Sequence, residues 1–204
     1  SNIPHPEVPA KEGHTFGGWI DAPKTMPAND IVVTGSYNVN KYLITFKIGD
    51  EVIVSDSLAY GSVIVAPEAP AKEGHTFSGW SDIPEMMPAE DVTVTGSFAV
   101  NKYKLTYVVD GNVFHTDSVA YGSRLSAIDE PVKDGCTFSG WVGLPEFMPA
   151  KDVTVTGSFV TNGYKLTYMV DGEIYKTIVV EYGTAITPEE APVKEGHTFS
   201  GWSD

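Results

Sequence analysis

The sequence predicts a mostly β protein, folded as a tandem array of small units with about four short strands and little helix in each. Two observations support this class. Short runs of alternating apolar and polar residues are separated by Gly and Pro turns, and such alternation is typical of strands. A fixed period is typical of repeated small units rather than of one large domain. Four tryptophans recur at a constant interval of 61 residues: Trp19, Trp80, Trp141 and Trp202.

The recurring motifs define two complete repeats and two partial ones. The Trp motif reads KEGHTFSGW with small variations, and in three copies it continues into MPAxDVTVTGSF or a close variant. The predicted repeats are a partial one at 1–40, complete ones at 41–101 and 102–162, and a partial one at 163–204. We interpret the chain as a piece of a longer array, in which contacts between neighbours stabilise units that are marginal alone.

The first half of each repeat predicts a β-hairpin. Apolar and polar residues alternate from Tyr103 to Asp110, and the pair Asp110-Gly111 suits a two-residue type I′ turn. The pair Asp171-Gly172 suits the same turn. In the earlier copy the order is Gly49-Asp50, which fits either a type II′ turn or a turn shifted by one residue.

The second half predicts two further strands. GHTFSGW forms the third. Phe77 and Trp80 are three residues apart, so strict alternation would place them on opposite faces, and we expect a bulge at Ser78-Gly79 that turns both to one side. DVTVTGSF alternates cleanly, so Val153, Val155 and Phe159 share one face.

Between the hairpin and the third strand lies a segment rich in Pro, Ala and Glu. Its clearest copy, Thr187-Pro188-Glu189-Glu190, predicts one helical turn with an N-cap.

The junctions between repeats are short. Only four residues separate Phe98 from Tyr103, with no flexible Ser/Gly or Pro-rich linker. We therefore expect the last strand of one unit to run almost directly into the first strand of the next, as a semi-rigid string. Strands left without partners in the partial repeats offer edges for end-to-end self-association.

The negative net charge argues against two classes of binding partner. The net charge is −14, with 27 acidic and 13 basic residues and no acidic tail. This balance argues against nucleic acid and against anionic membrane surfaces, both of which need a basic face. No apolar stretch approaches the roughly 18–20 residues of a membrane span, so we expect no membrane insertion within these residues.

No residue pattern predicts a metal or a cofactor. The single cysteine, Cys136, takes the slot that holds His14, His75 and His197 in the other copies, which indicates a packing position at a strand start rather than a zinc site. Calcium candidates, Asp91 with Glu90 and Asp110 beside Gly111, lack a dense loop of oxygen ligands. We instead expect Asp91 and its counterpart Asp152 to cap the turn after Met-Pro-Ala.

The repeated aromatics form the predicted core of each unit. An alternative is a surface platform on which sugars stack, but a 61-residue unit needs its large rings inside. Every feature that could carry chemistry occurs several times, whereas a catalytic centre is assembled once, so we predict no enzyme. The predicted core residues are Trp19, Trp80, Trp141, Trp202, Phe16, Phe77, Phe138 and Phe199.

Taken together, the Asp-Gly turn, Tyr-Gly, Gly-x-Thr-Phe-x-Gly-Trp and Met-Pro-Ala-x-Asp-Val resemble the Listeria–Bacteroides repeat family, known from the B repeats of internalin-type surface proteins. The resemblance covers essentially the whole chain and implies β-grasp-like units in a secreted protein or one at the bacterial cell surface or cell wall. Units of that family often have a longer insert after the Trp. The short segment from Trp80 to Met87 therefore leaves no room for a full-length β-grasp helix.

Two functions follow as hypotheses. The first is a non-catalytic stalk or spacer, with neighbouring repeats as the main partners. The second is a multivalent adhesion module that binds host glycan or protein weakly at each unit; the sequence points to no particular residues for its surface.

Overall fold

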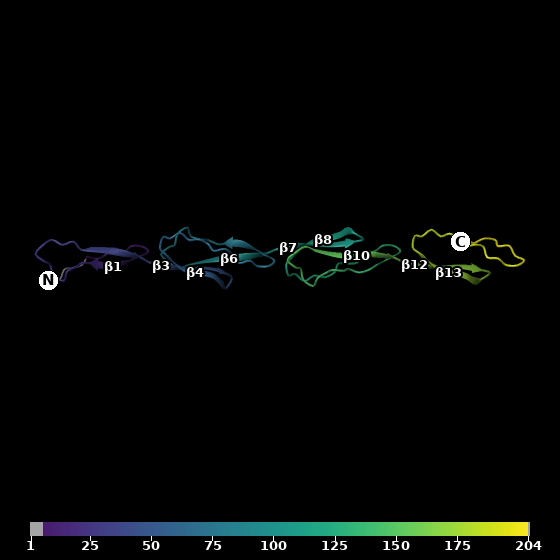
Figure 1. The fold of residues 1–204 in the computed structure, drawn as a ribbon, viewed down its shortest axis with the longest axis horizontal. Coiled ribbons are helices and arrows are strands. Elements are labelled where there is room, and N and C mark those ends of the chain that lie inside the picture. The colour runs from purple at the N-terminus through teal and green to yellow at the C-terminus, as the bar shows by residue number, and fades with distance from the viewer. Residues whose placement is uncertain (1–5, 204) are drawn as a thin grey trace. The chain divides into compact units, whose positions relative to one another are not determined.

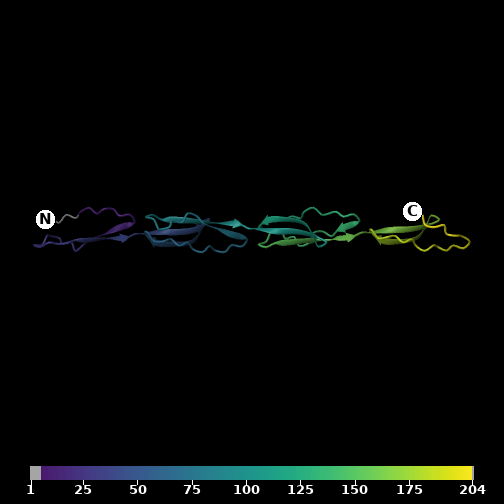
Figure 2. The same cartoon turned by 90° about the horizontal axis from the view of Figure 1, so that it is seen from above.

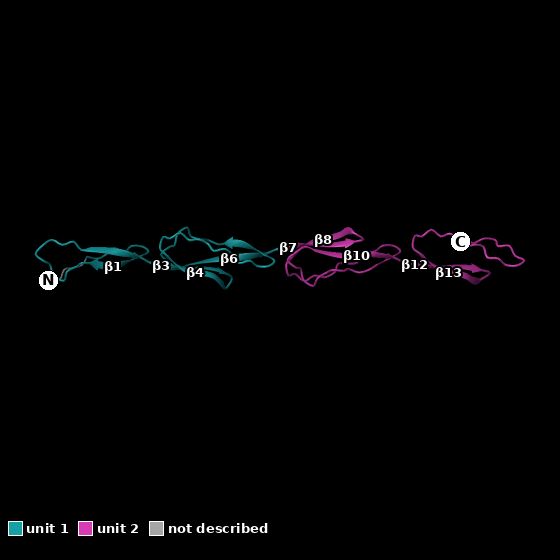
Figure 3. Ribbon diagram, viewed as in Figure 1, with its two compact units in different colours: residues 1–101 teal, residues 102–204 magenta. Residues whose placement is uncertain are grey.

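The computed structural model describes residues 6–203, and these contain β-strands and no helix (Figure 1). The chain divides into two compact units, 1–101 and 102–204 (Figure 3). Each unit holds one complete and one partial repeat, and each is described by itself below. Residues 1–5 and 204, which fall in the predicted partial repeats, lie outside the described part. Within that part, no helix could cross a membrane.

The complete repeat of the first unit forms a four-stranded mixed sheet. Its order is β4-β3-β6-β5, with antiparallel outer pairs β3–β4 and β5–β6 and a parallel central pair β3–β6. This is the β-grasp-like arrangement that the resemblance implies. Figure 2 shows the strands from a second direction. The strands are β3 (Lys41–Ile48), β4 (Glu51–Ala59), β5 (His75–Trp80) and β6 (Val92–Val100). The partial repeat contributes the antiparallel pair β1 (His14–Ile20) and β2 (Thr34–Val39).

The complete repeat of the second unit has the same topology, with its last strand interrupted at Ser158. β7 pairs with β8 antiparallel and with β10 parallel, and β9 pairs with β11 antiparallel. The strands are β7 (Lys102–Val109), β8 (Asn112–Ala120), β9 (Cys136–Phe138), β10 (Val153–Gly157) and β11 (Phe159–Thr161). The partial repeat forms the hairpin β12 (Gly163–Val170) and β13 (Glu173–Glu181).

The hairpin turns follow the predicted chemistry. Asp110 and Gly111 both have positive φ, at 49° and 80°, as a type I′ turn requires. Gly49 has φ 60° whereas Asp50 does not lie in the positive region, which fits the type II′ alternative. Each hairpin also has a register shift two or three residues before its turn, for example between Phe46 and Lys47, which no local sequence signal predicted.

The predicted bulge in the Trp motif is confirmed. The register of β5 against β6 shifts between Phe77 and Gly79, and Gly79 has φ 109°. The extra residue turns Phe77 and Trp80 to the same side, where their rings meet edge to face at 5.1 Å. Both rings lie over Gly96 of β6, where an added Cβ would come within 2.7 Å of the Phe77 ring.

The core of each complete repeat lies on one face of its sheet. In the first, the buried residues are Ile44, Phe46, Ile64, Met87 and Val94. In the second, they are Leu105, Tyr107, Met148, Val153 and Val155. The predicted alternation along the last strand is confirmed for residues 153–156, because Val153 and Val155 are buried while Thr154 and Thr156 are exposed; Phe159 follows the interruption at Ser158 and is partly buried. The methionine of Met-Pro-Ala, 1% exposed in both complete repeats, is a core residue that sequence analysis overlooked.

The predicted helical turn at Thr187-Pro188-Glu189-Glu190 is wrong, since this segment is irregular. Its carbonyl groups accept hydrogen bonds from distant side chains instead of from a helical backbone. The Trp202 indole donates to the Glu189 carbonyl at 2.8 Å, and the Tyr168 hydroxyl donates to the Thr187 carbonyl at 3.3 Å. With Pro188 and Pro192 also removing two backbone donors, these contacts hold the segment against the sheet without a helix.

The predicted role of Asp91 and Asp152 is also wrong. Neither caps the local turn. Asp91 Oδ1 accepts a hydrogen bond from the Leu43 backbone N–H at 2.7 Å, and Asp152 Oδ1 accepts one from the Lys104 N–H at 2.8 Å. Each carboxylate therefore ties the start of the last strand to the start of the first, 48 residues earlier.

Candidate functional site: the junction between repeats

Consecutive repeats are joined by one residue between strands. β2 ends at Val39 and β3 begins at Lys41, which leaves Asn40 between them. β11 ends at Thr161 and β12 begins at Gly163, which leaves Asn162. The predicted direct passage of one unit's last strand into the next unit's first strand is thus confirmed at these two junctions.

Asn40 makes hydrogen bonds to both repeats that it joins. Its backbone N–H donates to the Gly13 carbonyl at 2.8 Å, and its carbonyl accepts from the Tyr60 N–H at 2.9 Å. Its side-chain Oδ1 accepts from the Thr15 hydroxyl at 2.7 Å. Because Gly13 and Thr15 belong to the preceding repeat and Tyr60 to the following one, these bonds restrict the backbone torsions at the connection.

Asn162 repeats this geometry in the second unit. Its N–H donates to the Gly135 carbonyl at 2.8 Å, and its carbonyl accepts from the Tyr182 N–H at 2.9 Å. Its Oδ1 accepts from the Thr137 hydroxyl at 2.6 Å. The same arrangement in two separate units indicates a built joint rather than a chance contact.

At each of these junctions, the ring of a tyrosine packs directly against the Cα of a glycine. Gly13 has φ 65°, and a Cβ built on it would lie 2.0 Å from Cγ of Tyr60. Gly135 has φ 67°, and its Cβ would lie 2.0 Å from Cγ of Tyr182. Only glycine meets both conditions, a left-handed backbone and a ring seated directly on the Cα. We call this set of Gly, Thr, Asn and Tyr the junction clasp.

The junction segments are predicted from the sequence, but no role follows from it for these residues. The signal was present, because Asn40, Asn101 and Asn162 recur at the 61-residue period together with the glycine of the Trp motif. Asn101 also donates its N–H to the Gly74 carbonyl at 2.9 Å and accepts from the Thr76 hydroxyl at 2.7 Å. What local pattern could not reveal is that Asn bonds residues about 25 positions earlier.

The predicted core aromatics lie together in pairs within each repeat. Each Trp meets the Phe of its own motif edge to face, with centroids 4.8–5.2 Å apart. Trp80 and Trp141 are partly buried and pack against the two cores. Their indoles donate to the carbonyls of Pro67 and Ile128 at 3.0 and 3.1 Å. The Trp therefore anchors the Pro-rich segment to the sheet.

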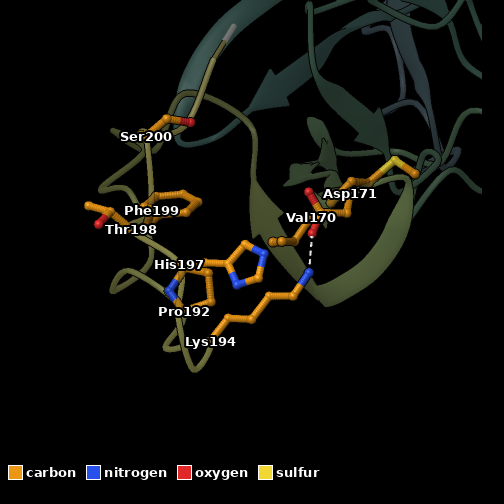
Figure 4. Close-up of a pocket in the computed structure, with 10 residues that line it drawn as sticks. Val170, Asp171, Pro192, Lys194, His197, Thr198, Phe199 and Ser200 are labelled. Carbon is orange, nitrogen blue, oxygen red and sulfur yellow. Dashed lines mark hydrogen bonds and ion pairs between the residues drawn. The ribbon is translucent and has the colours of Figure 1, made fainter.

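The pocket in the partial repeat 163–204 corresponds to a place that is filled in the complete repeat before it (Figure 4). Asp171 and Phe199 line it and are the counterparts of Asp110 and Phe138. In the complete repeat, Asp110 Oδ1 accepts from the Phe159 N–H at 3.1 Å, and the Phe138 ring meets Phe159. The pocket thus has the form of the groove that receives a last strand.

Within this pocket, Asp171 pairs with a lysine. Lys194 Nζ lies 2.8 Å from Asp171 Oδ2, and this hydrogen bond holds the pKa of the carboxyl below its usual value. Both groups are largely exposed to solvent. Such an ion pair contributes little to stability.

The cysteine and the histidines lie at separate positions in the fold. Cys136 begins β9, as His14 and His75 begin β1 and β5, so the predicted strand-start slot is confirmed in these three copies, whereas His197 begins no strand. His115 is exposed in β8. Among residues 6–203, no group of three or more His, Cys, Asp and Glu side chains is placed to hold a metal ion.

The chain is similar to a described family and to several bacterial proteins. A model of the Listeria-Bacteroides repeat domain matches residues 1–38, 42–97, 103–161 and 164–204. Internalin H of Listeria monocytogenes is 35% identical over 128 residues, which cover 53% of this chain and 23% of that protein. A protein of Evansella cellulosilytica, provisionally named a Gly-rich membrane protein, is 27% identical over 98% of this chain and 27% of its own length.

A second E. cellulosilytica protein, provisionally named a membrane protein, is 29% identical over 81% of this chain and 28% of its own length. The chain therefore spans roughly a quarter of the length of the relatives it matches.

Proposed function

The chain belongs to the Listeria–Bacteroides repeat family, and from this premise we propose that it is a non-catalytic stalk or spacer within a larger bacterial cell-surface protein. Part of Internalin H is similar to this chain, and two further relatives carry names that place them at a membrane. The stalk would separate another part of such a protein from the secreting cell or its wall.

The junction clasp is the observation that carries this proposal. A stalk must keep consecutive units in a defined relation, because free rotation at each joint would let the array collapse. The clasp fixes both neighbours of Asn40 and of Asn162 through three hydrogen bonds and a ring seated on glycine. A linker of one residue leaves little chain to swivel.

The distribution of functional groups supports a non-catalytic role. The carboxylates of Asp91 and Asp152 and the indoles of Trp80 and Trp141 recur at the same positions of the two complete repeats, where they bond backbone groups. The pocket at Asp171 matches a strand-binding groove rather than a substrate cleft.

Small-angle X-ray scattering of the 204-residue chain tests the proposal. A stalk predicts a particle much longer than it is wide, with a pair-distance distribution that is skewed toward short distances and has a long tail. A symmetric distribution of a compact globule would contradict the proposal. Replacing Asn40 and Asn162 by Gly should shorten the average particle, because the clasp loses its side-chain acceptor at both of these joints.

Multivalent adhesion is the second candidate, and one feature favours it. Phe114 is 49% exposed and its ring lies 5.9 Å from that of Trp141, while Tyr175 is 47% exposed and lies 5.9 Å from Trp202. Partly exposed aromatic pairs of this kind can stack on a sugar ring. The repeat 41–101 has Ile53 at the equivalent position, so the surface is not the same in every unit.

Glycan binding by the full chain, compared with a Phe114→Ala and Tyr175→Ala variant, tests adhesion separately from the stalk. Loss of binding in the variant would support a sugar platform at these rings. Absence of binding to a broad glycan panel, with an elongated scattering profile, would leave the stalk as the function.

A further inference from the structure

The first and the last strand of each complete repeat are direct neighbours in the sheet, and they run parallel. The chain enters the first complete repeat through β3 at Lys41 and leaves it through β6 at Val100. Five residue pairs join these two strands, from Ile44 with Val92 to Ile48 with Gly96. The second repeat has the same five-pair ladder between β7 and β10, from Leu105 with Val153 to Val109 with Gly157.

Parallel pairing sets how tension acts on the ladder. Because β3 and β6 are parallel, the entry at Lys41 lies beyond one end of the ladder and the exit at Val100 lies beyond the other. Tension applied to the chain on both sides therefore slides the two strands past each other, across hydrogen bonds that are directed from strand to strand. All five pairs oppose this sliding together.

The antiparallel hairpin gives the opposite case within the same repeat. Lys41 pairs with Ala59, so the free ends of β3 and β4 lie side by side. Tension applied between those ends would open the pairs one after another, each carrying the force alone. The same sheet thus contains a pair that resists in shear and a pair that yields by peeling.

Side chains extend the parallel ladder at its ends. At the entry end, Asp91 Oδ1 accepts from the Leu43 N–H, and in the second repeat Asp152 accepts from the Lys104 N–H. At the far end of the second repeat, the Asp110 N–H donates to the Gly157 carbonyl at 3.1 Å, and the Asp110 carboxylate accepts from the Phe159 N–H at 3.1 Å.

The ladder is also shielded from water on one face. Ile44 and Phe46 of β3 and Val94 of β6 are each 1–2% exposed, and Leu105 and Val155 are 4% and 0% exposed in the second repeat. Water that could replace a loaded hydrogen bond is therefore kept from this face of the central pair.

We propose that each complete repeat is a tension-resisting module, in which the parallel pair of first and last strands acts as a shear clamp. The inference rests on the proposed stalk function, since a stalk between a cell and an attached object would carry tension along its chain. The clamp places that tension on β3 and β6, while β4, β5 and the Pro-rich segment lie outside the direct path between entry and exit.

The two repeats differ at one clamp position. Gly49 takes the place of Asp110, so the first repeat has no side chain to accept the N–H that corresponds to Phe159. The clamp therefore predicts that the repeat 41–101 yields at a lower force than the repeat 102–162. Aspartate at this position requires the whole Asp-Gly pair, because the type II′ turn at Gly49 calls for glycine at its first central position, whereas the type I′ turn accommodates Asp110 at φ 49°.

Single-molecule force spectroscopy on the full chain tests the clamp by changing only the direction of pulling. Cys136→His removes the native thiol with the residue that other copies carry. Lys41→Cys with Lys102→Cys attaches handles across the clamp, and Lys41→Cys with Ser57→Cys attaches them across the hairpin. We expect an unfolding force at least about twice as high in the first geometry, because paired residues break together rather than in sequence.

Equal forces in the two geometries would overturn the clamp. Pulling the chain by its termini adds a second test: each complete repeat of 61 residues releases up to roughly 200–220 Å at full extension. Gly49→Asp with Asp50→Gly, which restores the Asp-Gly pair of the other repeat, should raise the lower of the two unfolding forces, and Asp110→Gly should lower the higher one. If neither variant changes its force, the carboxylate has no part in the clamp.

The outcome separates this inference from the stalk itself. An elongated scattering profile with no dependence on pulling direction would refute the clamp and leave the stalk standing. A compact profile would refute the stalk, whatever the direction dependence shows.

Discussion

A methyl group added at the junction clasp should uncouple two repeats, and Gly135→Ala is the cleanest way to add it. Gly135 has φ 67°, so alanine there incurs the left-handed cost of about 1–2 kcal/mol. The new Cβ would also lie 2.0 Å from Cγ of Tyr182, which forces the ring to leave its seat. Overpacking of this kind costs about 1–3 kcal/mol.

The free-energy cost of this overlap should lie in the lower part of that range, because Tyr182 is 53% exposed and its ring can rotate into solvent. We therefore expect Gly135→Ala to lower the free energy of unfolding of the repeat 102–162 by about 2–3 kcal/mol. Gly196 provides the matched control. It has φ 71°, and a Cβ added there would meet nothing within 4 Å, so Gly196→Ala should cost its repeat only the backbone term, about 1–2 kcal/mol.

Native-state hydrogen exchange with peptide-level mass spectrometry is the suitable assay, because it reports opening free energies for each repeat separately. A double-mutant cycle isolates the collision. In a Tyr182→Ala background, Gly135→Ala should retain only its backbone cost. If Gly135→Ala lowers the free energy of unfolding equally with and without the Tyr182 ring, the packing of Tyr182 on Gly135 does not stabilise the junction. Only the hydrogen bonds of the clasp would then hold the two repeats.

Three further perturbations test the repeat interior. Burial raises the pKa of Tyr107, so the folded repeat favours the neutral phenol. The free energy of unfolding of the repeat 102–162 should therefore be highest below the ordinary tyrosine pKa of about 10 and should decline as pH rises above it. Tyr107→Phe introduces the residue that the other repeat has at this position, Phe46. In urea unfolding from about pH 8 to 11, this variant should show a smaller decline of the midpoint. An unchanged decline would show that Tyr107 is not the group responsible. Met148→Ala should cost about 2–5 kcal/mol in urea unfolding, since Met148 is 1% exposed; a cost below about 0.5 kcal/mol would contradict a core role. Gly96→Ala should cost about 1–3 kcal/mol and expose tryptophan to iodide quenching, because its Cβ would lie 2.7 Å from the nearest ring carbon; unchanged quenching would show that the rings do not rest on this glycine.

Local features of the fold could be predicted from the sequence because their causes are local. The positive φ of Asp110 and Gly111 follows from the residue types in a two-residue turn. The bulge beside Gly79 follows from two aromatics at odd spacing, Phe77 and Trp80, whose rings meet on one side of the sheet. In both cases a few adjacent residues determine the geometry.

The features that sequence analysis missed depend on partners far along the chain. Asp91 reads as a local cap, yet it bonds Leu43, 48 residues away. Met87 reads as part of a turn motif, yet it is buried, because its N–H and carbonyl pair with Ser62 and Gly61 and hold it over the sheet. No local pattern reports such pairings, so they require the three-dimensional structure.

The parallel pairing of the first and last strands is a third case. Alternation predicts that β3 and β6 are strands, but it does not say that they are neighbours or that they run in the same direction. The junction clasp was missed for a related reason. Its asparagines recur visibly, but Asn40 and Asn162 each bond two residues of the preceding repeat and one of the following repeat that lie far from them in the sequence.

The central claim is that the clasp holds consecutive repeats in one fixed relation, and a distance measurement across one junction tests it most directly. Spin labels at Thr116 of β8 and Thr177 of β13, equivalent exposed positions on either side of Asn162, can be introduced in a Cys136→His background. Pulsed electron paramagnetic resonance should then give one narrow distance distribution, which Asn162→Gly broadens. A broad distribution in the parent chain, unchanged by Asn162→Gly, would contradict the claim.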